Sequence, residues 1–559
     1  MKVKYSDKYR GNKIKRYSEI LSILARYGFE EVFSRGNAIK RFFRRLFGKK
    51  NINPVITGRW ERVRHMLEEL GPTYVKFGQV MSNRPDILPN ELIDELSKLQ
   101  ESVKPFDGAI AKDIVERELG NSINQLYSEF DTTPFASASI AQVHRAKLIS
   151  GEDVVVKIMR PGIKSLIKVD LSIMYTLAKV AEQQFRRLRF FTPTEVVHEF
   201  EKAIKKETDF NIELAHIERF RQQFKDNNDV LIPETYKSYC TNKVLTMEYI
   251  DGISPTELEQ LQKANIDIAD AANKLVNNMM MQVFKYAYFH ADPHPGNLRI
   301  LSDGRICFLD YGLMGSLIPE WKKQLTTLLI SLSKRDSGRI ADAILVLARN
   351  TDLDIKISLE YEINEMLDKY SFVSLKAINL GTLLQEVLHI IYNFKLRFPP
   401  AFYLIGKTIS LVESIALRLH PEFNVIDSLQ PFAKSMIKDR FNPKSMSREI
   451  GYTLAEASLM LKELPGEMRD IVQQLRSGNT QIQFQHRGLG ELTNRLERSG
   501  NRLSYAIVLA ALIIGSSFMT VSKIPPLWKD IPLIGLTGFL ISGLMGFALL
   551  FSTFRRIRK

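Results

Sequence analysis

The longest apolar runs of the chain lie near its C-terminal end. Residues 503–521 and 531–551 are almost uninterrupted apolar sequence, without the polar face that an amphipathic surface helix would show. At about 1.5 Å per residue, each run is long enough to cross a hydrocarbon core of about 30 Å. Only residues 522–530 separate the runs, so the pattern predicts a transmembrane helical hairpin. The alternative is a pair of buried helices in a soluble domain.

Charged residues at the outer ends of this hairpin predict its orientation. Arginine and lysine flank both ends, and by the positive-inside rule both ends face the cytoplasm. Glycines in the second run favour close helix contact, for example between protomers. The flanking cations are Arg495, Arg498, Arg502, Arg555, Arg556, Arg558 and Lys559, and the glycines are Gly535, Gly538, Gly543 and Gly546.

Shorter apolar patterns predict a mixed fold upstream of the hairpin. Helical spacing predicts helices over residues 163–189, 194–224 and 322–332, a helical region from there to about residue 440, and a helix over residues 454–475. Short β-branched and apolar runs predict strands at residues 153–158, 231–233 and 243–250, and a β-hairpin at 298–309. The chain is therefore expected to be α+β and predominantly helical.

Composition limits the size, partners and compartment of the protein. A chain of 559 residues, 45% of them apolar, suffices for roughly two or three structural units. The formal net charge of +15 favours an anionic partner, which could be nucleic acid, a phosphorylated substrate or anionic lipid. Residues 13–50 are very basic and predicted to be helical, and residues 40–50 interleave cations with Phe and Leu. Together with the hairpin, this segment favours anionic membrane lipids over nucleic acid. The two cysteines and the polar, basic residues 1–16 argue against a disulfide scaffold and a secretory signal.

Residues 289–315 carry the strongest chemical signal. Asp292 and Asn297 bracket a segment rich in proline and glycine, which forms a stiff loop that can aim both side chains at one point. The Asp-Gly turn of the predicted hairpin then returns the chain and places Asp310 beside that loop. Carboxylate and amide oxygens suit Mg²⁺ bound together with substrate phosphates, which leaves Asp292 as the candidate base. With no cysteine or third histidine nearby, His290 and His294 are interpreted as loop scaffolding rather than zinc ligands.

These residues resemble the catalytic centre of a kinase. Asp292 and Asn297, followed by Asp310-Tyr311-Gly312, are similar to the catalytic loop and D-F-G of the protein-kinase fold. The fuller string H-A-D-P-H-P-G-N resembles that of the ABC1/ADCK/UbiB family of atypical kinases. The resemblance implies a protein-kinase-like two-lobe fold that binds ATP and Mg²⁺, with Asp292 as the catalytic acid/base and Asn297 and Asp310 as metal ligands. A proline-rich surface turn before an ordinary hairpin is the alternative.

The same resemblance assigns nucleotide contacts to a small lobe that begins near residue 130. Residues 135–143 replace the Gly-rich loop with Ala and Ser, and because Ala keeps a Cβ the cover over the phosphates should have a different shape. Lys157 is similar to the lysine of V-A-I-K and would contact the α- and β-phosphates, while residues 247–249 resemble the hinge that holds adenine. The implied contacts are Phe135, Ala136, Ser137, Ala138, Ser139, Ile140, Ala141, Gln142, Val143, Lys157, Met247, Glu248 and Tyr249.

A further motif is peculiar to this family. Lys76, Gly78 and Gln79 match its K-x-G-Q signature, on a helix predicted to start after Gly71-Pro72. The resemblance implies that this helix packs over the nucleotide cleft, where a protein kinase would seat its peptide. Its polar side chains would then have regulatory or catalytic roles in that cleft.

The predicted helix over residues 194–224 carries several acidic residues. Glu213 is the candidate partner of Lys157, whereas Glu207 and Asp209 match the family's E-x-D. Glu207 and Glu213 lie about 600° apart around one helix, so one can face Lys157 while the other meets the K-x-G-Q helix. A run of exposed helical acids is the alternative.

The resemblance also implies a division of the chain. An N-terminal helical extension with the K-x-G-Q motif covers residues 1–129, a kinase-like small lobe with a helical insert 130–253, and a kinase-like helical large lobe 254–440. A helical juxtamembrane segment and linker then covers residues 441–502, and the hairpin 503–552. Residues 318–320 lead directly into a helix, without the long activation segment that docks a peptide substrate.

The family's link to isoprenoid-quinone (ubiquinone) biosynthesis implies a membrane-anchored atypical kinase or ATPase at the cytoplasmic face of a bacterial inner membrane. Such a protein would use Mg-ATP to present lipid-soluble quinone precursors to the enzymes of that pathway. A phosphotransferase acting on a small molecule or lipid head group is one alternative. A non-catalytic, nucleotide-sensing scaffold is another.

Overall fold

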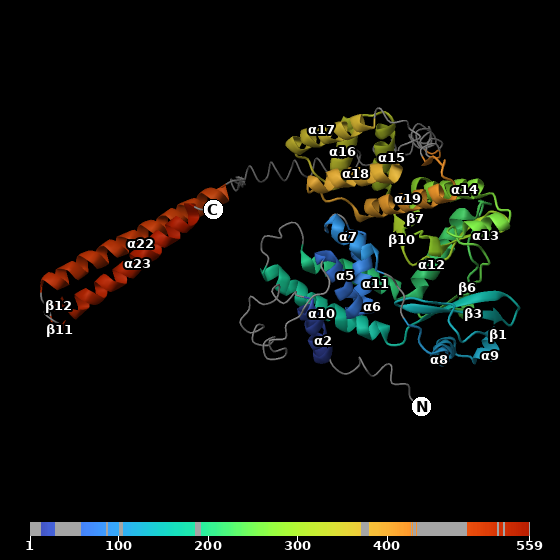
Figure 1. Ribbon diagram of the computed structural model, residues 1–559, viewed down its shortest axis with the longest axis horizontal. Helices are drawn as coiled ribbons and strands as arrows, with labels where there is room; N and C mark the ends of the chain where they lie inside the picture. Colours follow the sequence, from blue (N-terminus) through green and yellow to red (C-terminus); the bar gives the residue numbers. More distant parts are fainter. Residues whose placement is uncertain are drawn as a thin grey trace, which may run out of the picture. The chain divides into compact units, whose positions relative to one another are not determined.

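The protein, described by a computed structural model, contains two compact units, residues Met1–Ser447 and Arg448–Lys559. Helices predominate in both units, and the first unit also contains β-sheets (Figure 1). The predicted α+β, predominantly helical character is therefore confirmed. The structure describes residues 13–27, 58–84, 88–99, 104–184, 192–370, 379–425, 428, 432, 489–522, 525–528 and 531–557.

An antiparallel sheet forms the region expected to bind the nucleotide. Its strand order is β1-β3-β4-β6, with β2 paired to β3. The β-branched run at residues 154–156 favours the extended conformation of β4. Lys157 of β4 pairs with Val143 of β3 and Leu245 of β6, so this lysine lies within the sheet rather than at an edge. The strands are β1 (Tyr127–Phe130), β2 (Ala136–Ser137), β3 (Ala141–Leu148), β4 (Asp153–Met159) and β6 (Val244–Glu248).

One face of this sheet is covered by the helices that precede it in sequence. α8 (Gly108–Leu119) and α9 (Ile123–Leu126) enclose an apolar cluster that includes Val154 and Val156 of β4. Successive side chains of a strand point to opposite faces, so Lys157 points away from this cluster. The lysine therefore lies on the face directed toward the rest of the unit.

A second group of strands holds the 289–315 motif. β8 and β9 form the predicted hairpin, with Leu298 paired to Phe308 and Gly304 at φ +78° in the turn. β5 pairs with β9 in parallel, and β7 pairs with β10. The pairing of β7 with β10 thus brings the two ends of the motif together, and β5 adds an upstream strand to the hairpin. These strands are β5 (Val230–Leu231), β7 (Tyr288–His290), β8 (Leu298–Ile300), β9 (Ile306–Phe308) and β10 (Met314–Ser316).

The single long helix predicted over residues 194–224 is wrong. The structure has two helices there, α11 (Pro193–Glu207) and α12 (Phe210–Phe224). Asp209 ends the continuity because its side chain accepts a hydrogen bond from the Asn211 N–H, as an N-cap residue does. Glu207 and Glu213 consequently lie on different helices. The preceding predicted helix is present as α10 (Ile163–Gln184).

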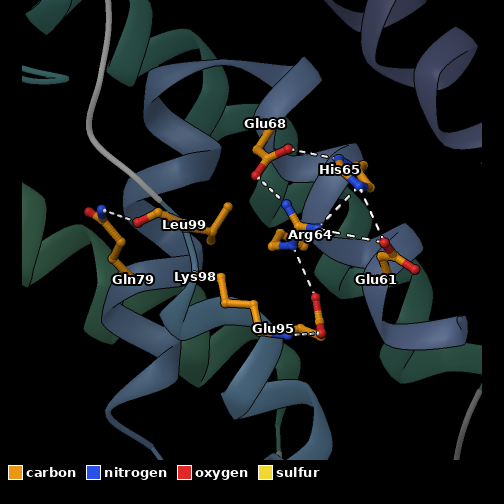
Figure 2. Close-up of polar contacts among 8 residues, drawn as sticks. All are labelled: Glu61, Arg64, His65, Glu68, Gln79, Glu95, Lys98 and Leu99. Carbon is orange, nitrogen blue, oxygen red and sulfur yellow. Dashed lines mark hydrogen bonds and ion pairs between the residues drawn. The ribbon is translucent and has the colours of Figure 1, made fainter.

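The N-terminal helices form a layer held together by ion pairs. Arg16 donates to buried Asp170 of α10 at 2.8 Å and to the Leu70 carbonyl at 2.6 Å. Arg64 of α5 contacts Glu95 of α7 at 3.0 Å (Figure 2). The layer consists of α2 (Lys13–Arg26), α5 (Arg59–Leu70), α6 (Pro72–Ser82) and α7 (Asn90–Ser97).

The described part of the predicted helical lobe, residues 254–370 and 379–425, is mainly helical apart from the strands given above, as predicted. Pro400 begins α19 at the predicted Pro-Pro break, and most of this helix is buried. Although α19 is long and apolar enough to span a membrane, its burial shows that it is a core helix. The helices are α13 (Leu258–Lys263), α14 (Ile268–Met280) with its π-helical extension (Met281–Tyr286), α15 (Pro319–Ser333), α16 (Ser337–Ala348), α17 (Leu353–Lys369), α18 (Leu380–Asn393) and α19 (Pro400–Leu419).

The second unit contains two long helices that lie side by side, α22 (Leu489–Val521) and α23 (Leu533–Ile557) (Figure 1). The segment Leu503–Val521 is long and apolar enough to cross a membrane and is almost wholly exposed, whereas the apolar part of α23, Leu533–Phe547, is shorter. A short ribbon of β11 (Leu527–Trp528) and β12 (Ile531–Pro532) connects them.

Glycines of α23 face α22 of the same chain. A Cβ on Gly538 would lie 2.1 Å from the Ser516 hydroxyl, and one on Gly535 2.5 Å from that of Thr520. These two glycines thus allow close helix contact within the hairpin, as the glycine pattern favours. The first part of the predicted basic helix over residues 13–50 is present as α2, whereas residues 28–50 and the predicted helix over 454–475 lie outside the described residues.

Candidate active site

Lys157 lies between two carboxylates. Its Nζ is 2.8 Å from both Glu213 oxygens and 3.6 Å from Oδ2 of Asp310. β4 supplies the lysine, α12 the glutamate, and the segment after β9 the aspartate. The predicted partnership of Lys157 and Glu213 is thus present, and it joins three elements that are far apart in sequence.

The ionisation of these three groups follows from burial and mutual attraction. Burial alone would lower the pKa of Lys157, but Asp310 and Glu213 raise that pKa above its ordinary value. Burial alone would likewise raise the pKa of Asp310, but Lys157 and the Gly312 N–H hold it well below its usual value. Burial raises the pKa of Glu213 to about 7, against the opposing effect of Lys157. A cation and an ionised Asp310 therefore face each other at neutral pH.

The loop from Asp292 to Asn297 lies beside Asp310. The Leu309 N–H donates to the Asn297 carbonyl at 2.9 Å, which joins the end of β9 to the loop. The Asn297 Nδ2 donates to the Asp292 carbonyl at 3.4 Å, so its Oδ1 is the atom left for a cation. The expected approach of Asp310 to this loop is therefore present.

His290 connects the two halves of this site. Its Nδ1 accepts from the Asp292 N–H at 3.2 Å, and its Nε2 donates to the Asp310 carbonyl. Burial lowers the pKa of His290, which keeps the ring neutral and able to both accept and donate. His294 accepts from the Gly296 N–H at the start of a short 3₁₀ turn. Both histidines therefore act as loop scaffolding, as expected.

A lysine that no motif predicted also contacts the site. The Nζ of Lys407, on α19, lies 3.5 Å from Oδ1 of Asp292. Lys407 lies more than 100 residues after the loop in sequence. A lysine within an apolar helical pattern does not by itself predict a contact with a distant aspartate. Only the fold brings the two residues together.

The Ala-rich loop is held by an arginine. Arg160 donates to the Ala138 carbonyl at 2.8 Å, to the Ser137 hydroxyl at 2.7 Å and to the Lys104 carbonyl at 3.1 Å. The Ala138 N–H in turn donates to the Ala141 carbonyl at 2.8 Å. Together these bonds fix the loop between β2 and β3.

Not every residue of the predicted nucleotide cover points outward. Gln142 is fully buried and accepts from the Phe106 N–H at 3.1 Å, so its side chain belongs to the protein interior. Ile140 and Ala141 are buried as well, whereas Phe135 is 54% exposed. Predicted nucleotide contacts from Ile140, Ala141 and Gln142 would therefore have to come from their backbone atoms.

The predicted hinge, residues 247–249, lies at the end of β6. The Tyr249 N–H donates to the Asp153 carbonyl at 2.9 Å, so this N–H is already used within the sheet and is not available to adenine. The Arg145 guanidinium lies 4.1 Å from the centre of the Tyr249 ring and 5.0 Å from that of Phe135. Met247 is buried and Glu248 lies at the last position of β6.

The K-x-G-Q residues of α6 contact two different parts of the protein, the end of α11 and the segment after α7. Lys76 forms an ion pair with Glu207 at the end of α11. Gln79, in contrast, donates to the Leu99 carbonyl at 3.2 Å (Figure 2). A Cβ on Gly78 would lie 2.3 Å from the Leu99 side chain. Gly78 and Gln79 therefore hold α6 against the segment that follows α7, and a role for Gln79 in the nucleotide site stays a prediction.

The carboxylate of Asp310 and the amide oxygen of Asn297 are suited to bind Mg²⁺ together with the phosphates of a nucleotide. The part of the chain that the structure describes contains no cluster of three or more His, Cys, Asp and Glu side chains that could hold a metal by itself. Asp310 is ionised, and its side chain retains 46% of its exposure. One carboxylate and one amide fit a cation that takes its remaining ligands from a nucleotide and water.

Comparison with known proteins gives three family matches. Residues 98–344 match the ABC1 atypical kinase-like domain, residues 363–424 the UbiB helical domain, and residues 487–555 the ABC1/UbiB kinase-like C-terminal domain. The first match contains Lys157, Glu213, Asp292 and Asp310. Lys407 lies in the second.

Individual relatives match over most of the chain. An uncharacterized protein in the hydrogenase 1 5′ region of Clostridium pasteurianum is 34% identical over 547 residues, which cover 97% of this chain and 99% of that relative. A probable protein kinase UbiB of Pseudomonas fluorescens (strain Pf0-1) is 34% identical over 401 residues, with coverages of 70% and 74%. A solved complex of a Mycobacterium tuberculosis protein with erythromycin is 21% identical, with a TM-score of 0.44 and coverages of 65% and 93%.

Proposed function

The chain belongs to the ABC1/UbiB family of atypical kinase-like proteins, and on this basis we propose that it is a two-lobed, membrane-anchored kinase or ATPase that uses Mg-ATP. One observation carries the proposal. Lys157 lies 2.8 Å from Glu213 and 3.6 Å from an ionised Asp310, whose segment is hydrogen-bonded to the Asp292–Asn297 loop. The structure thus brings the cation Lys157, the proposed metal ligand Asp310 and the loop of the proposed base Asp292 close together, which phosphoryl transfer requires.

Each side chain has a distinct role in the proposed reaction. Lys157, oriented by Glu213, binds the α- and β-phosphates, while Asn297 and Asp310 hold Mg²⁺. When bound, Mg²⁺ supplies positive charge to the phosphate oxygens. Asp292 accepts the proton of the attacking O–H group as that oxygen bonds to the γ-phosphorus. The bond from phosphorus to the bridging oxygen breaks, and its electron pair leaves with ADP.

The acceptor is proposed to be water or a small molecule, not a peptide. α15 begins at Pro319, directly after β10 ends at Ser316, so little chain is available for a peptide-docking activation segment. A small-molecule or lipid-head-group phosphotransferase is thus the second candidate, because a lipid acceptor would be close to a membrane anchor. A nucleotide-sensing scaffold is the third.

The second unit is proposed to anchor the protein in the bacterial inner membrane through two transmembrane helices, with the kinase-like unit in the cytoplasm. Large apolar side chains on both helices are exposed, as a lipid-facing surface requires. Anionic lipids are the proposed surface partner, since the chain carries a formal net charge of +15. These side chains include Leu503, Ile507, Ile514, Phe518, Leu544 and Phe547.

The proposed biological role is in isoprenoid-quinone (ubiquinone) biosynthesis. Support comes from the relatives named UbiB and from the family resemblance. ATP turnover would then help to present lipid-soluble precursors to partner enzymes. If so, cells whose only copy carries Asp292→Asn should lose quinone, and an unchanged quinone profile would contradict this role.

Hydrolysis by the full-length protein in lipid vesicles tests the enzyme itself. Wild type should release phosphate from ATP only with Mg²⁺, faster on anionic than on neutral vesicles, and Asp310→Asn should abolish release. The matched control is Asp303→Asn, because Asp303 is an exposed aspartate in the turn of the same hairpin. Nucleotide binding without turnover would favour the scaffold, and labelled phosphate in a lipid fraction would favour the phosphotransferase.

A further inference from the structure

Lys407 is placed next to the proposed catalytic base. Its Nζ lies 3.5 Å from Oδ1 of Asp292, and the two side chains remain 40% and 36% exposed. The pair is therefore partly accessible and is not a buried structural ion pair. A ligand that enters the site could contact both groups.

The backbone that carries Lys407 is held firmly against the catalytic loop. Its neighbours Gly406 and Thr408 are buried, and the Thr408 hydroxyl donates to the His290 carbonyl at 3.5 Å. α19 also packs on α14 and β10 (Figure 1). The position of the lysine relative to Asp292 is thus set by the core, while its four-carbon side chain leaves the ammonium group able to move.

The catalytic loop lacks a cation of its own. Residues 292–297 read D-P-H-P-G-N, with no lysine or arginine. A base that contacts an attacking oxygen lies roughly 3 Å from it, and that oxygen lies about 3–3.5 Å from the phosphorus. An ammonium group 3.5 Å from the base carboxylate can therefore reach the terminal phosphate with a small change of rotamer.

We propose, on the basis of the function proposed above, that Lys407 is a catalytic residue that contacts the terminal phosphate of ATP. In the nucleotide-free protein it pairs with Asp292. When ATP binds, the ammonium group moves to the γ-phosphate oxygens and neutralises the charge that spreads over them during transfer. The helical region that follows the kinase-like core thereby completes the catalytic site.

The affinities for a non-hydrolysable ATP analogue and for ADP test this contact without requiring turnover. In full-length protein in vesicles, Lys407→Met should weaken binding of the ATP analogue by about tenfold and leave ADP binding unchanged, because only ATP carries the γ-phosphate. Lys407→Arg should restore most of the preference for ATP. The kcat of Lys407→Met should fall by about 100-fold. Arg418→Gln, which removes an exposed cation from the same helix, is the control and should behave as wild type.

The outcomes separate this inference from the proposed function. If Lys407→Met keeps both the wild-type preference for ATP and the wild-type kcat, Lys407 has no catalytic role, but the proposed ATP-dependent function is unaffected. If wild type binds ATP but does not hydrolyse it, the proposed hydrolysis fails, and the ratio of the two affinities still decides the role of Lys407. If wild type binds neither nucleotide, both proposals fail. An equal loss of ATP and ADP binding would indicate a structural role and would overturn the inference.

Discussion

Lys76 of the K-x-G-Q helix and Glu207 of the E-x-D motif form an ion pair that joins α6 to the last turn of α11. Their side chains retain only 17% and 28% of their exposure, so water screens the pair only partly. The charge of Lys76 also lowers the pKa of Asp310, although less than Lys157 and the Gly312 N–H do, and burial opposes all three. The pair thus connects a helix outside the kinase-like core to the proposed metal ligand.

A double-mutant cycle should detect this pair. We expect Lys76→Met and Glu207→Gln to be coupled by about 0.5–2 kcal/mol in the free energy of unfolding, because each variant removes the same partly buried contact. Urea unfolding of the two single variants and the double variant measures the coupling. The exposed pair Arg117–Asp113 is the control and should show less than about 0.5 kcal/mol. Equal coupling for the two pairs would show that Lys76 and Glu207 do not fasten α6.

Glu213 should make stability depend on pH in an unusual direction. Burial raises its pKa to about 7 in the folded protein, whereas the unfolded chain has the ordinary value near 4.5. Between these values the folded state binds more protons than the unfolded state, so this contribution to stability is present at low pH and is lost as pH rises toward 7. The stability of wild type relative to Glu213→Gln should fall by roughly 3 kcal/mol over that window.

Unfolding of both proteins between pH 5 and pH 8 measures this difference. Above pH 7 the difference should become constant, because Glu213 is then ionised in both states. A difference that grows with rising pH would mean that attraction to Lys157 outweighs burial, and that the pKa of Glu213 lies below its ordinary value.

Gly78 should tolerate a side chain poorly. A Cβ there would lie 2.3 Å from Leu99 Cδ1 and 3.0 Å from Leu67 Cδ1, so Gly78→Ala should destabilise the packing of α6 on α7 by about 1–3 kcal/mol. Thermal unfolding measures the loss. Because the clash is with a side chain, Leu99→Ala should partly relieve it, and the double variant should be more stable than the sum of the single effects predicts. Strict additivity would show that the glycine is needed for another reason.

The features predicted correctly depend on local sequence. The Asp-Gly turn and its flanking apolar residues fix the β8–β9 hairpin, as predicted. Glu213, chosen among the acids of the predicted helix as the candidate partner of Lys157, forms that pair. The break after Glu207 could not be predicted from apolar periodicity, because that period continues through the cap at Asp209. The contact between Lys407 and Asp292 depends on how α19 packs, which no local pattern encodes.

The hydrogen bonds of the Arg160 guanidinium should fix the position of the Ala-rich loop, residues 135–143. Its guanidinium donates to Ser137 and Ala138 at the start of the loop and to Lys104, and therefore joins the loop to the segment before α8. A lysine keeps the charge but cannot make this planar set of bonds. We therefore expect Arg160→Lys and Arg160→Ala to weaken ATP binding by similar factors, about tenfold, which corresponds to the loss of about one hydrogen bond to a charged donor.

Titration of the full-length protein with a fluorescent ATP analogue measures these affinities. Arg117→Lys, which alters an exposed arginine on α8, should leave the affinity unchanged. If Arg160→Lys binds ATP as tightly as wild type while Arg160→Ala does not, the charge of Arg160 acts on the phosphates directly and the geometry of its hydrogen bonds is unimportant. Equal loss in both variants, with unchanged thermal unfolding, would instead show that Arg160 shapes the loop. This loop lacks the glycines whose backbones can approach phosphates closely, so its position has to be fixed by such side-chain bonds.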